Sequence, residues 1–553
     1  MKEGKTALKV AASAALAAVL AGCGVSTGIT NAATHAGTVH RSAATSAPPL
    51  VMAISPYGSY TQNFNPFSSS ANPGTDGFIY EPLFYFNTVG PQVYGLLGKS
   101  YSWSDGGRVL TVDLRTNVKW TDGTAFSSKD VVFTFDLLKK YPALDTSGVW
   151  SKLSAVTAPN AHEVVFRFKT TDVPYGVYVL ETYIVPQHIW SKISDPAKYT
   201  NPNPVGTGPY ELSTFTSQEY TFKPNPHYYL GVPKVPEIEV PAYDSNNAIN
   251  EALAAGQLDW SGQFVPDVKG LFTSKSPYNH YWFPPYEVAG LYPNLKNPLL
   301  KNLAVREAIN VAVNRNEMGA KNEYGYEKAA SPTALILPTQ KKYLAPGLPV
   351  NEKYDPSEAV KILEKAGFKK NASGVFVSPS GQPLEFTIQV PTGWSDWDAD
   401  CALMAQELTS IGIKTTVVED AYGEYVANLQ GGKYTLAMSW TNPGPTPYYA
   451  LYNALDSHGD WNLEGWNNAA TNAALNEYAT TTNPTVQVKA IQKLEKIMVD
   501  DLPFIPLLDG ALWYEYSSQN YVGWPTASNP YVTPAPYSWP APEIVVMHLK
   551  PRS

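Results

Sequence analysis

Apolar and polar residues follow two kinds of period along the chain, and together they predict a mixture of strands and helices. Alternation of apolar and polar positions predicts strands at 109–114 and 163–169. Apolar positions three and four residues apart predict helices at 245–256 and 303–317. A further helix is expected after Ser127, which can cap it together with an acidic residue at its third position.

The second half of the chain contains the clearest helix start. In Asp355-Pro356-Ser357-Glu358, the Asp can cap a helix, the Pro suits its first position and the Glu its third. The elements expected after it are a strand at 384–390, a helix at 397–410, strands at 413–419 and 434–440, and a helix at 486–500. This order of units favours an open α/β sheet.

Two of these strands end in segments that are rich in aromatic residues, Pro and Gly. The strand at 384–390 continues into 391–397, and the strand at 434–440 continues into 441–449. Ligands of open α/β sheets bind outside the carboxyl ends of the strands. Aromatic rings beside Asn, Asp, Thr and Ser suit a ligand with apolar faces and many hydroxyl or amide groups. The alternative interpretation is a pair of aromatic corners of the core.

The composition excludes some classes of function but does not identify one. Of 553 residues, 16% are charged and 12% are aromatic, and 40 Lys and Arg against 48 Asp and Glu give a net charge of −8. A chain without basic clusters is not expected to bind nucleic acid. The apolar and aromatic content excludes general disorder, and the length suggests two or three domains.

The N-terminus has the pattern of an export signal. Three lysines precede an uncharged, apolar stretch that is too short to span a bilayer and that ends at Leu20-Ala21-Gly22-Cys23. These four residues resemble the processing box of bacterial lipoproteins, which implies a signal peptide at 1–22 and lipid on Cys23. Residues 23–49 have the composition of a flexible tether. We expect an extracytoplasmic protein anchored to the cell membrane, periplasmic or at the cell surface; an ordinary signal cleaved elsewhere is the alternative.

The sequence lacks the motifs of common catalytic and metal sites. It has no HExxH, Walker A, GxSxG or CxxC motif, and its eight His have no metal-ligand spacing. We therefore expect no metal, no cofactor and no enzymatic activity. The acidic cluster Asp396, Asp398 and Asp400 could serve a glycosidase, but carboxylates also stabilise a helix start such as that of 397–410. Cys401 has helical spacing to apolar residues and is expected to be a buried small hydrophobe.

A set of segments, in order, resembles family 5 of the extracytoplasmic solute-binding proteins of ABC importers, the class with oligopeptide-, dipeptide- and nickel-binding members. The segments are SDG at 104–106, LTVDLRTNVKWTDGTAFSSKDVVFTFDLL at 110–138, VGTGPYELSTF at 205–215, NPHYY at 225–229, LAVREAINVAVNR at 303–315, YDPSEAVKILEKAGF at 354–368 and DLPFIPL at 501–507. The resemblance implies an α/β, two-lobed periplasmic-binding-protein fold with hinge crossings and an extra subdomain in lobe one.

The resemblance also implies how the chain is divided and how it works. Lobe one would take 50–75, 206–295 and 508–553, its extra subdomain 76–205, and lobe two 296–507. A solute captured between the lobes by hinge closure would pass to the membrane permease of the importer. The implied partners are a small-molecule ligand and ABC permease subunits, with no nucleic acid, and we expect a monomer.

The ligand is where the sequence departs from one branch of the family. Peptide-binding members usually carry an acidic residue shortly after the Trp that corresponds to Trp440, where it pairs with the amine of the peptide, and here Asn442 stands in that region. The segments 393–397 and 443–448 look more like the branch that binds β-linked oligosaccharides. A short neutral oligosaccharide is therefore favoured, an oligopeptide is the alternative, and nickel or haem is less favoured.

On this hypothesis tryptophans stack on sugar rings and polar side chains bind hydroxyl groups. The candidate ligand-binding residues are Trp394, Asp396, Trp397, Trp440, Asn442, Tyr448, Tyr286 and Glu287. The three tryptophans would be the stacking platforms, and Asp396 and Asn442 would supply polar recognition. Tyr286 and Glu287 are weaker candidates from the opposite lobe, because their aromatic run could equally be a core strand and turn.

Overall fold

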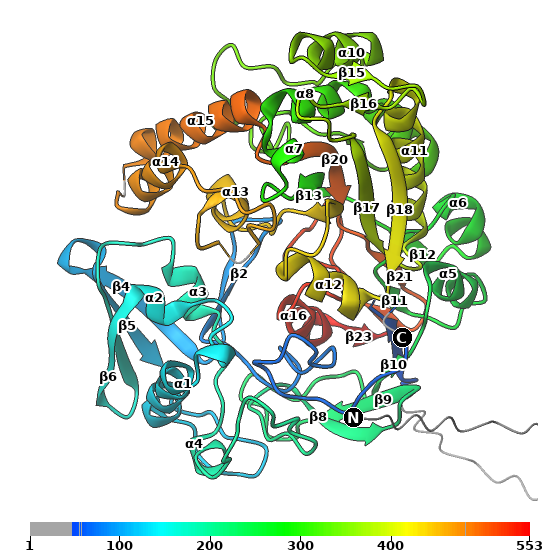
Figure 1. The fold of residues 1–553 in the computed structure, drawn as a ribbon. Helices are drawn as coiled ribbons and strands as arrows, with labels where there is room; N and C mark the ends of the chain where they lie inside the picture. Colours follow the sequence, from blue (N-terminus) through cyan, green and yellow to red (C-terminus); the bar gives the residue numbers. More distant parts are fainter. Residues whose placement is uncertain (1–46, 55, 57, 460, 482, 553) are drawn as a thin grey trace, which may run out of the picture. The chain divides into compact units, whose positions relative to one another are not determined.

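Two mixed sheets and a smaller antiparallel sheet organise the chain in the computed structural model, which describes residues 47–54, 56, 58–459, 461–481 and 483–552 (Figure 1). These residues belong to one compact unit. The expected signal peptide, the expected lipidation site Cys23 and the expected tether up to residue 46 lie outside the described residues.

The first mixed sheet collects strands from distant parts of the chain. Its order is β12 (Asn279–Tyr281), β21 (Glu515–Ser517), β11 (Trp260–Ser261), β1 (Leu50–Ala53), β10 (Ile238–Pro241), β9 (Glu219–Pro224) and β8 (Tyr210–Phe215). After β10 comes α5 (Asn246–Ala254), the helix predicted at 245–256. Its cap is Ser245, whose hydroxyl accepts a hydrogen bond from the backbone N–H of Ala248.

The smaller sheet has four antiparallel strands and lies within the expected extra subdomain. Its order is β4 (Gly98–Ser104), β5 (Val109–Leu114), β7 (Glu163–Phe168) and β6 (Leu153–Asn160). The helix α1 (Ser128–Lys140) packs on it through Phe135, whose ring centroid lies 5.0 Å from that of Phe166. Ser127 and Asp130 form the reciprocal capping box at the start of α1. Both strand predictions and the cap are confirmed.

The second mixed sheet supports the predicted site. Its order is β14 (Lys328–Ala329), β20 (Ile505–Ala511), β13 (Pro285–Pro293), β19 (Leu436–Trp440), β17 (Glu385–Pro391) and β18 (Lys414–Asp420). The chain passes from β17 through α11 (Ser395–Ile411) to β18, and through α12 (Tyr422–Gln430) to β19. The strands β17, β18 and β19 are parallel, while β13 and β20 run antiparallel to their neighbours. This is the open α/β sheet that the sequence predicts.

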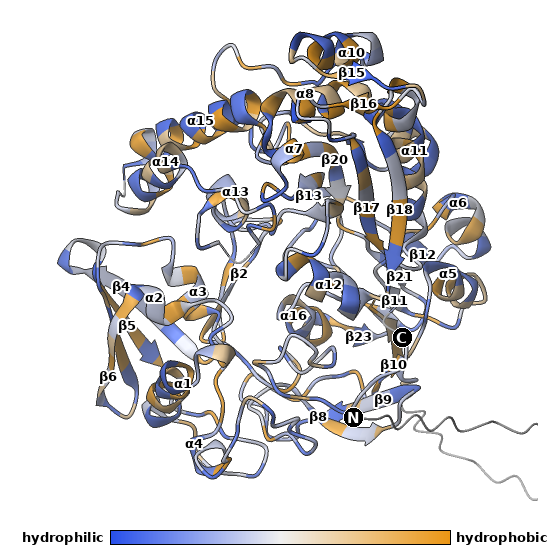
Figure 2. Ribbon diagram, viewed as in Figure 1, coloured by the Kyte–Doolittle hydropathy of each residue, from blue (hydrophilic) through white to orange (hydrophobic). Residues whose placement is uncertain are grey.

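The helix α11 closes the core against this sheet. Its Cys401 is fully buried, with the sulfur 3.8 Å from that of Met438 on β19, so the thiol is a core group as predicted. Figure 2 shows hydrophobic and hydrophilic residues on each of α10 (Pro356–Lys365), α11 and α15 (Pro484–Asp501), as expected for helices with one buried face. The carboxylate of Asp355 caps α10 by accepting from the N–H of Glu358, which confirms that helix start.

One predicted helix is shorter than expected. The helix at 303–317 divides into α8 (Leu303–Ala312) and a single turn, α9 (Arg315–Glu317). Val313 has extended backbone angles, and the Asn314 side chain accepts from the N–H of Glu317 and so caps the new turn. An Asn side chain that competes for backbone N–H groups favours a cap over a helix interior.

Sheet membership places the crossings between the two mixed sheets differently from the expected boundaries at 295 and 507. All of β13 and β20 pair within the second sheet, and β13 already begins at Pro285 while β20 extends to Ala511. The chain therefore leaves the first sheet after β12 and returns to it at β21, which starts at Glu515. We propose 282–284 and 512–514 as the hinge crossings.

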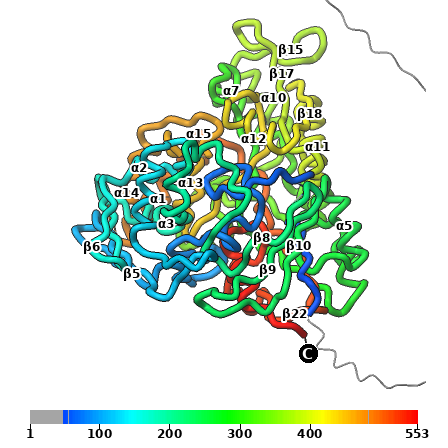
Figure 3. The backbone as a smooth tube through the Cα atoms, turned by 90° about the horizontal axis from the view of Figure 1, so that it is seen from below, coloured from blue at the N-terminus to red at the C-terminus, as the bar shows by residue number. Residues whose placement is uncertain are grey.

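The helix α13 (Pro447–Leu455) contacts the subdomain that carries the four-stranded sheet (Figures 1 and 3). The Tyr449 hydroxyl donates to the carbonyl of Pro174 over 3.1 Å, and the Tyr178 hydroxyl donates to the Asn453 side-chain oxygen over 3.3 Å. These two hydrogen bonds join α13 to residues 174–178 of the subdomain, which are far from α13 in sequence.

Candidate ligand-binding site

Strand order brings the predicted aromatic segments together. Because β17 and β19 are parallel neighbours, their carboxyl ends, Pro391 and Trp440, meet at one edge of the second sheet. The strand β13 is antiparallel to β19, with Ala289 opposite Trp440, so the start of β13 lies at the same edge. Tyr286 and Glu287 therefore belong to the same sheet as Trp440. Our expectation that they come from the opposite lobe is wrong, because it assigned β13 to the first lobe.

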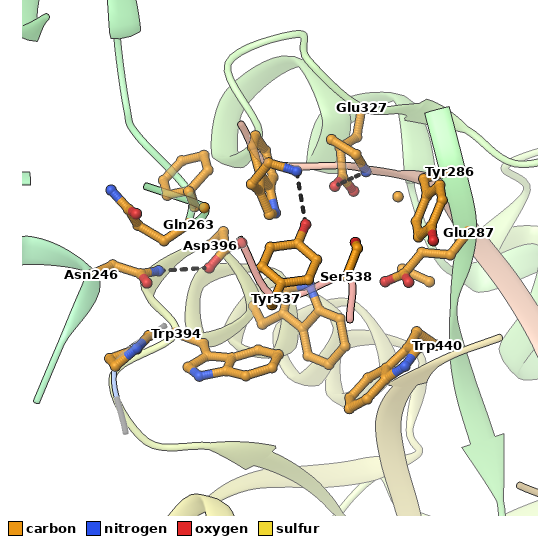
Figure 4. Close-up of a pocket in the computed structure, with 18 of the residues that line it drawn as sticks. Asn246, Gln263, Tyr286, Glu287, Glu327, Trp394, Asp396, Trp440, Tyr537 and Ser538 are labelled. Carbon is orange, nitrogen blue, oxygen red and sulfur yellow. Dashed lines mark hydrogen bonds between the residues drawn. The ribbon is translucent and has the colours of Figure 1, made fainter. Parts of the chain in front are cut away.

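A cavity of 350 Å³ opens at this edge (Figure 4). All the predicted site residues except Tyr448 line it, namely Tyr286, Glu287, Trp394, Asp396, Trp397, Trp440 and Asn442. Its other walls include Asn246, Gln263, Phe264, Glu327, Tyr422, Trp513, Tyr537 and Ser538. Asn246 begins α5, which follows β10, and Gln263 follows β11, so these two residues reach the cavity from segments next to strands of the first sheet.

The tryptophans form one continuous aromatic wall. The ring centroids of Trp394 and Trp397 are 5.2 Å apart, and that of Trp440 lies 6.1 Å from Trp394 and 5.8 Å from Trp397. Tyr422, at the start of α12, stacks on Trp394 with centroids 5.8 Å apart and an interplanar angle of 20°. Trp394 and Trp440 are partly exposed, whereas Trp397 is only 6% exposed. The rings of Trp394 and Trp440 are therefore available to a flat apolar surface.

Asp396 joins the two sides of the cavity. Its carboxylate accepts a hydrogen bond of 3.3 Å from the side-chain amide of Asn246 on α5 (Figure 4). Burial raises the pKa of Asp396 to about 6, and backbone N–H groups at the start of α11 oppose this rise.

The other two carboxylates of this acidic cluster point elsewhere. Asp400 is buried and accepts from the Asn322 side chain over 2.8 Å, and burial raises its pKa to about 7. Asp398 does not line the cavity, and burial raises its pKa to about 7. The expectation that all three carboxylates serve the helix start is therefore wrong for Asp400, which faces Asn322 instead.

Glu287 lies against the neighbouring strand at a glycine. A Cβ atom added to Gly510 on β20 would lie 2.9 Å from Glu287 Cγ, so only a glycine leaves room for the Glu287 side chain as placed. Burial raises the pKa of Glu287 to about 8.

Glu327 is a cavity residue that the sequence interpretation missed. It stands just before the short strand β14, and its Oε1 accepts from the backbone N–H of Ala511 over 2.7 Å. Its Oε2 is buried without a hydrogen-bond partner among the described residues, and burial raises its pKa. Nothing in the local pattern marks residue 327, because only the pairing of β14 with β20 brings it to the site.

A second cavity of 330 Å³ adjoins the first on the side of the subdomain. The two share Tyr286, Asn442, Pro443 and Ser538, and the second is also lined by Tyr178, Glu181, Tyr449 and Asn453. Glu181 accepts from the backbone N–H of Phe86 over 2.9 Å, and burial raises its pKa to about 7. The Thr88 hydroxyl donates to the Tyr286 hydroxyl oxygen over 3.0 Å at the shared wall.

Tyr448 is not brought to either cavity. It is 2% exposed on α13 and stacks on Tyr478, with ring centroids 4.4 Å apart and an interplanar angle of 13°.

In the described part of the chain, no group of three or more His, Cys, Asp and Glu side chains is arranged to hold a metal ion. None of the helices described combines the length and apolar character needed to cross a membrane.

Comparison with known proteins identifies the family. Residues 92–462 match the bacterial extracellular solute-binding proteins, family 5 Middle. The mannohexaose-bound periplasmic oligopeptide-binding protein of Thermotoga maritima superposes with a TM-score of 0.84 at 28% identity, over 91% of this chain and 98% of that one. Protein XP55 of Streptomyces lividans is 27% identical over 406 residues, 72% of each chain. The oligopeptide-binding protein AppA of Bacillus subtilis is 23% identical over 461 residues, 80% of this chain and 83% of its own.

The family match covers more than half of the chain, and its position includes the four-stranded sheet, the aromatic wall and most of the second mixed sheet. The chain therefore belongs to the bacterial extracellular solute-binding proteins of family 5 and is the extracytoplasmic solute-binding protein of an ABC importer.

Proposed function

We propose that the protein captures a short oligosaccharide in the cavity between its two mixed sheets and delivers it to the importer. The observation that carries this proposal is the wall of Trp394, Trp397 and Trp440, two of whose rings are partly exposed to the cavity. Aromatic faces bury the apolar faces of sugar rings, and neighbouring polar side chains bind their hydroxyl groups. The mannohexaose bound to the 28% identical protein of Thermotoga maritima supports the same ligand class.

The geometry supports capture by closure of two lobes. The cavity has walls from both mixed sheets, and the hydrogen bond between Asn246 and Asp396 links them. Closure around a ligand would remove it from water and present one compact surface to the permease. We further propose that Cys23 carries the lipid anchor and that the protein acts as a monomer on the outer side of the cell membrane.

An oligopeptide is the second candidate ligand. The carboxylates of Glu327, which is buried, and Glu287, which is partly exposed, lie in the cavity wall and favour it, since they could face the ammonium of a peptide. The fold of AppA in complex with a nonapeptide resembles this chain with a TM-score of 0.77.

Calorimetry separates the two ligand classes. The mature protein would be titrated with mannohexaose, cellohexaose and a mixture of tripeptides. We expect saturable binding of an oligosaccharide and none of the tripeptides. Tripeptide binding without any response to saccharides would contradict the proposal. The recovered saccharide should have its original length, and shortened products would instead indicate a glycosidase that uses the carboxylates of the cavity.

A substitution in the aromatic wall tests the site itself. Trp394→Ala should weaken oligosaccharide binding by about 5- to 30-fold, because a lost ring contact of this kind is worth about 1 to 2 kcal/mol. Tyr354→Ala is the matched control, since Tyr354 is 42% exposed and lines neither cavity. Equal affinities of the two variants would place the ligand elsewhere.

A further inference from the structure

The charges that line the two cavities have one sign. Glu287, Glu327 and Asp396 line the first cavity and Glu181 lines the second. None of the described residues that line either cavity is a Lys, Arg or His. The protein as a whole is only mildly acidic, with 40 basic and 48 acidic residues, so this local imbalance does not follow from composition.

These carboxylates also lack ionic partners in the protein. None of the four takes part in an ion pair between described residues. Glu327 is 4% exposed, and its Oε2 has no hydrogen-bond partner there. Asp396 has a neutral amide partner, Asn246. A buried carboxylate without a counter-charge is costly, and a cation in the cavity would remove that cost.

The aromatic wall favours the same kind of group. Trp394, Trp440 and Trp513 line the cavity together with Glu287 and Glu327, and Figure 4 shows the carboxylates of Glu287 and Glu327 on the side across from the Trp394 and Trp440 rings. The face of an indole ring attracts an ammonium group, more strongly when water is excluded. Carboxylates and indole faces around one cavity are a suitable environment for an organic cation.

We propose that the ligand is a basic oligosaccharide, with at least one free amino group on a sugar ring. The ammonium group would lie among Glu287, Glu327 and Asp396, while the aromatic wall stacks on the sugar ring. This inference rests on the proposed function and replaces the neutral ligand that the sequence favours with a cationic one.

Three tetrasaccharides test the inference. Cellotetraose, tetra-N-acetylchitotetraose and its fully de-N-acetylated form share the β-1,4 linkage and differ in bearing a hydroxyl, an acetamido or an amino group at C2. Titrated into the mature protein at pH 7, the amino form should bind at least 10-fold more tightly than the other two. Equal or tighter binding of cellotetraose or the acetylated form would overturn the inference and leave the proposed function intact. Binding of tripeptides with no response to any saccharide would overturn both.

Substitutions of Glu by Gln keep the shape of the side chain and remove its charge, so they test where the ammonium group of the ligand binds. Glu287→Gln and Glu327→Gln should each weaken binding of the amino form about 10-fold and change cellotetraose binding less than 3-fold. Glu495→Gln is the matched control, because Glu495 is a buried carboxylate on α15 that lines neither cavity. Unchanged binding of the amino form by both cavity variants would overturn the assignment.

Discussion

At the scale of single residues, the site depends on where a side chain is missing. Gly510 has no Cβ, and the Glu287 side chain from the neighbouring strand occupies the space where one would stand. The Glu287 side chain therefore packs against the backbone of β20 at Gly510, where β20 has no side chain. The position of Glu287 is set by β20 as much as by β13.

Gly510→Ala should therefore displace Glu287. The added Cβ would lie 2.9 Å from Glu287 Cγ, and overpacking of this kind costs about 1 to 3 kcal/mol. We expect lower unfolding free energy in urea together with weaker ligand binding by calorimetry. Gly423→Ala on α12 is the control, since nothing lies within 4 Å of its Cβ position. A Gly510→Ala protein with unchanged binding would show that Glu287 does not contribute.

At the scale of elements, caps and long-range pairings differ in how far the sequence reveals them. The starts of α1, α5 and α10 were predictable because a cap and its partner lie within four residues of each other. The strands β17, β18 and β19 with α11 were predictable from period and order. The role of β13 was not, because its antiparallel pairing with β19 and β20 joins residues that are far apart in sequence.

The same difference applies within the site. The tryptophans follow directly from the strands that carry them, so their meeting at one edge could be inferred. Glu327 and Trp513 reach the cavity through β14 and β20, which the local pattern does not connect. Tyr448 was expected beside the tryptophans, but the turn after Trp440 continues into α13, where apolar spacing buries it.

The capping box of α1 can be tested directly. Ser127→Ala removes the side chain that accepts from the N–H of Lys129, and losing such a cap costs about 1 kcal/mol. We expect the urea midpoint of unfolding to fall while ligand affinity stays the same, because α1 lines neither cavity. An unchanged midpoint would mean that water replaces the cap at no cost.

The contact between α13 and the subdomain should control ligand release. Tyr449→Phe removes the hydrogen bond to Pro174, and we expect the ligand to dissociate about 5-fold faster, since a neutral hydrogen bond is worth about 1 kcal/mol. Stopped-flow measurement of tryptophan fluorescence would follow this rate. Tyr434→Phe is the control. It also removes one hydrogen bond, from the Tyr434 hydroxyl to the Leu463 carbonyl, and neither residue lines either cavity. Equal dissociation rates in the two variants would contradict a role in closure.

At the scale of the whole molecule, buried carboxyl groups occur well beyond the cleft. Burial raises the pKa of Glu495 to about 7 and that of Asp509 to about 7. Burial also raises the pKa of Glu543, and the Tyr228 hydroxyl lies within hydrogen-bond distance of Oε1 of Glu543 and of Oε1 of Glu81. In the folded protein these carboxyl groups keep their protons up to a higher pH than the same groups do in the unfolded chain.

Stability should therefore be highest in mildly acidic solution. Each group with a raised folded pKa binds its proton more tightly in the folded state, so the free energy of unfolding falls as pH rises from the unfolded pKa toward the folded one. We expect it to decrease between pH 5 and pH 8 in urea titrations at fixed ionic strength. Glu495→Gln should make this decrease shallower, because it removes one of the groups. Stability that increases over this range would contradict the expectation.

The position of the second cavity has a consequence for ligand length. Tyr178, Tyr449 and Asn453 line that cavity and also make the contact between α13 and the subdomain. A ligand that fills both cavities ends against this contact, and any longer ligand would have to separate it. The importer should then favour oligomers up to one limiting length, with affinity rising by each added unit and dropping beyond that limit. The subdomain with the four-stranded sheet, which contributes no tryptophan to the aromatic wall, would then set the maximum length of the ligand that the importer takes up.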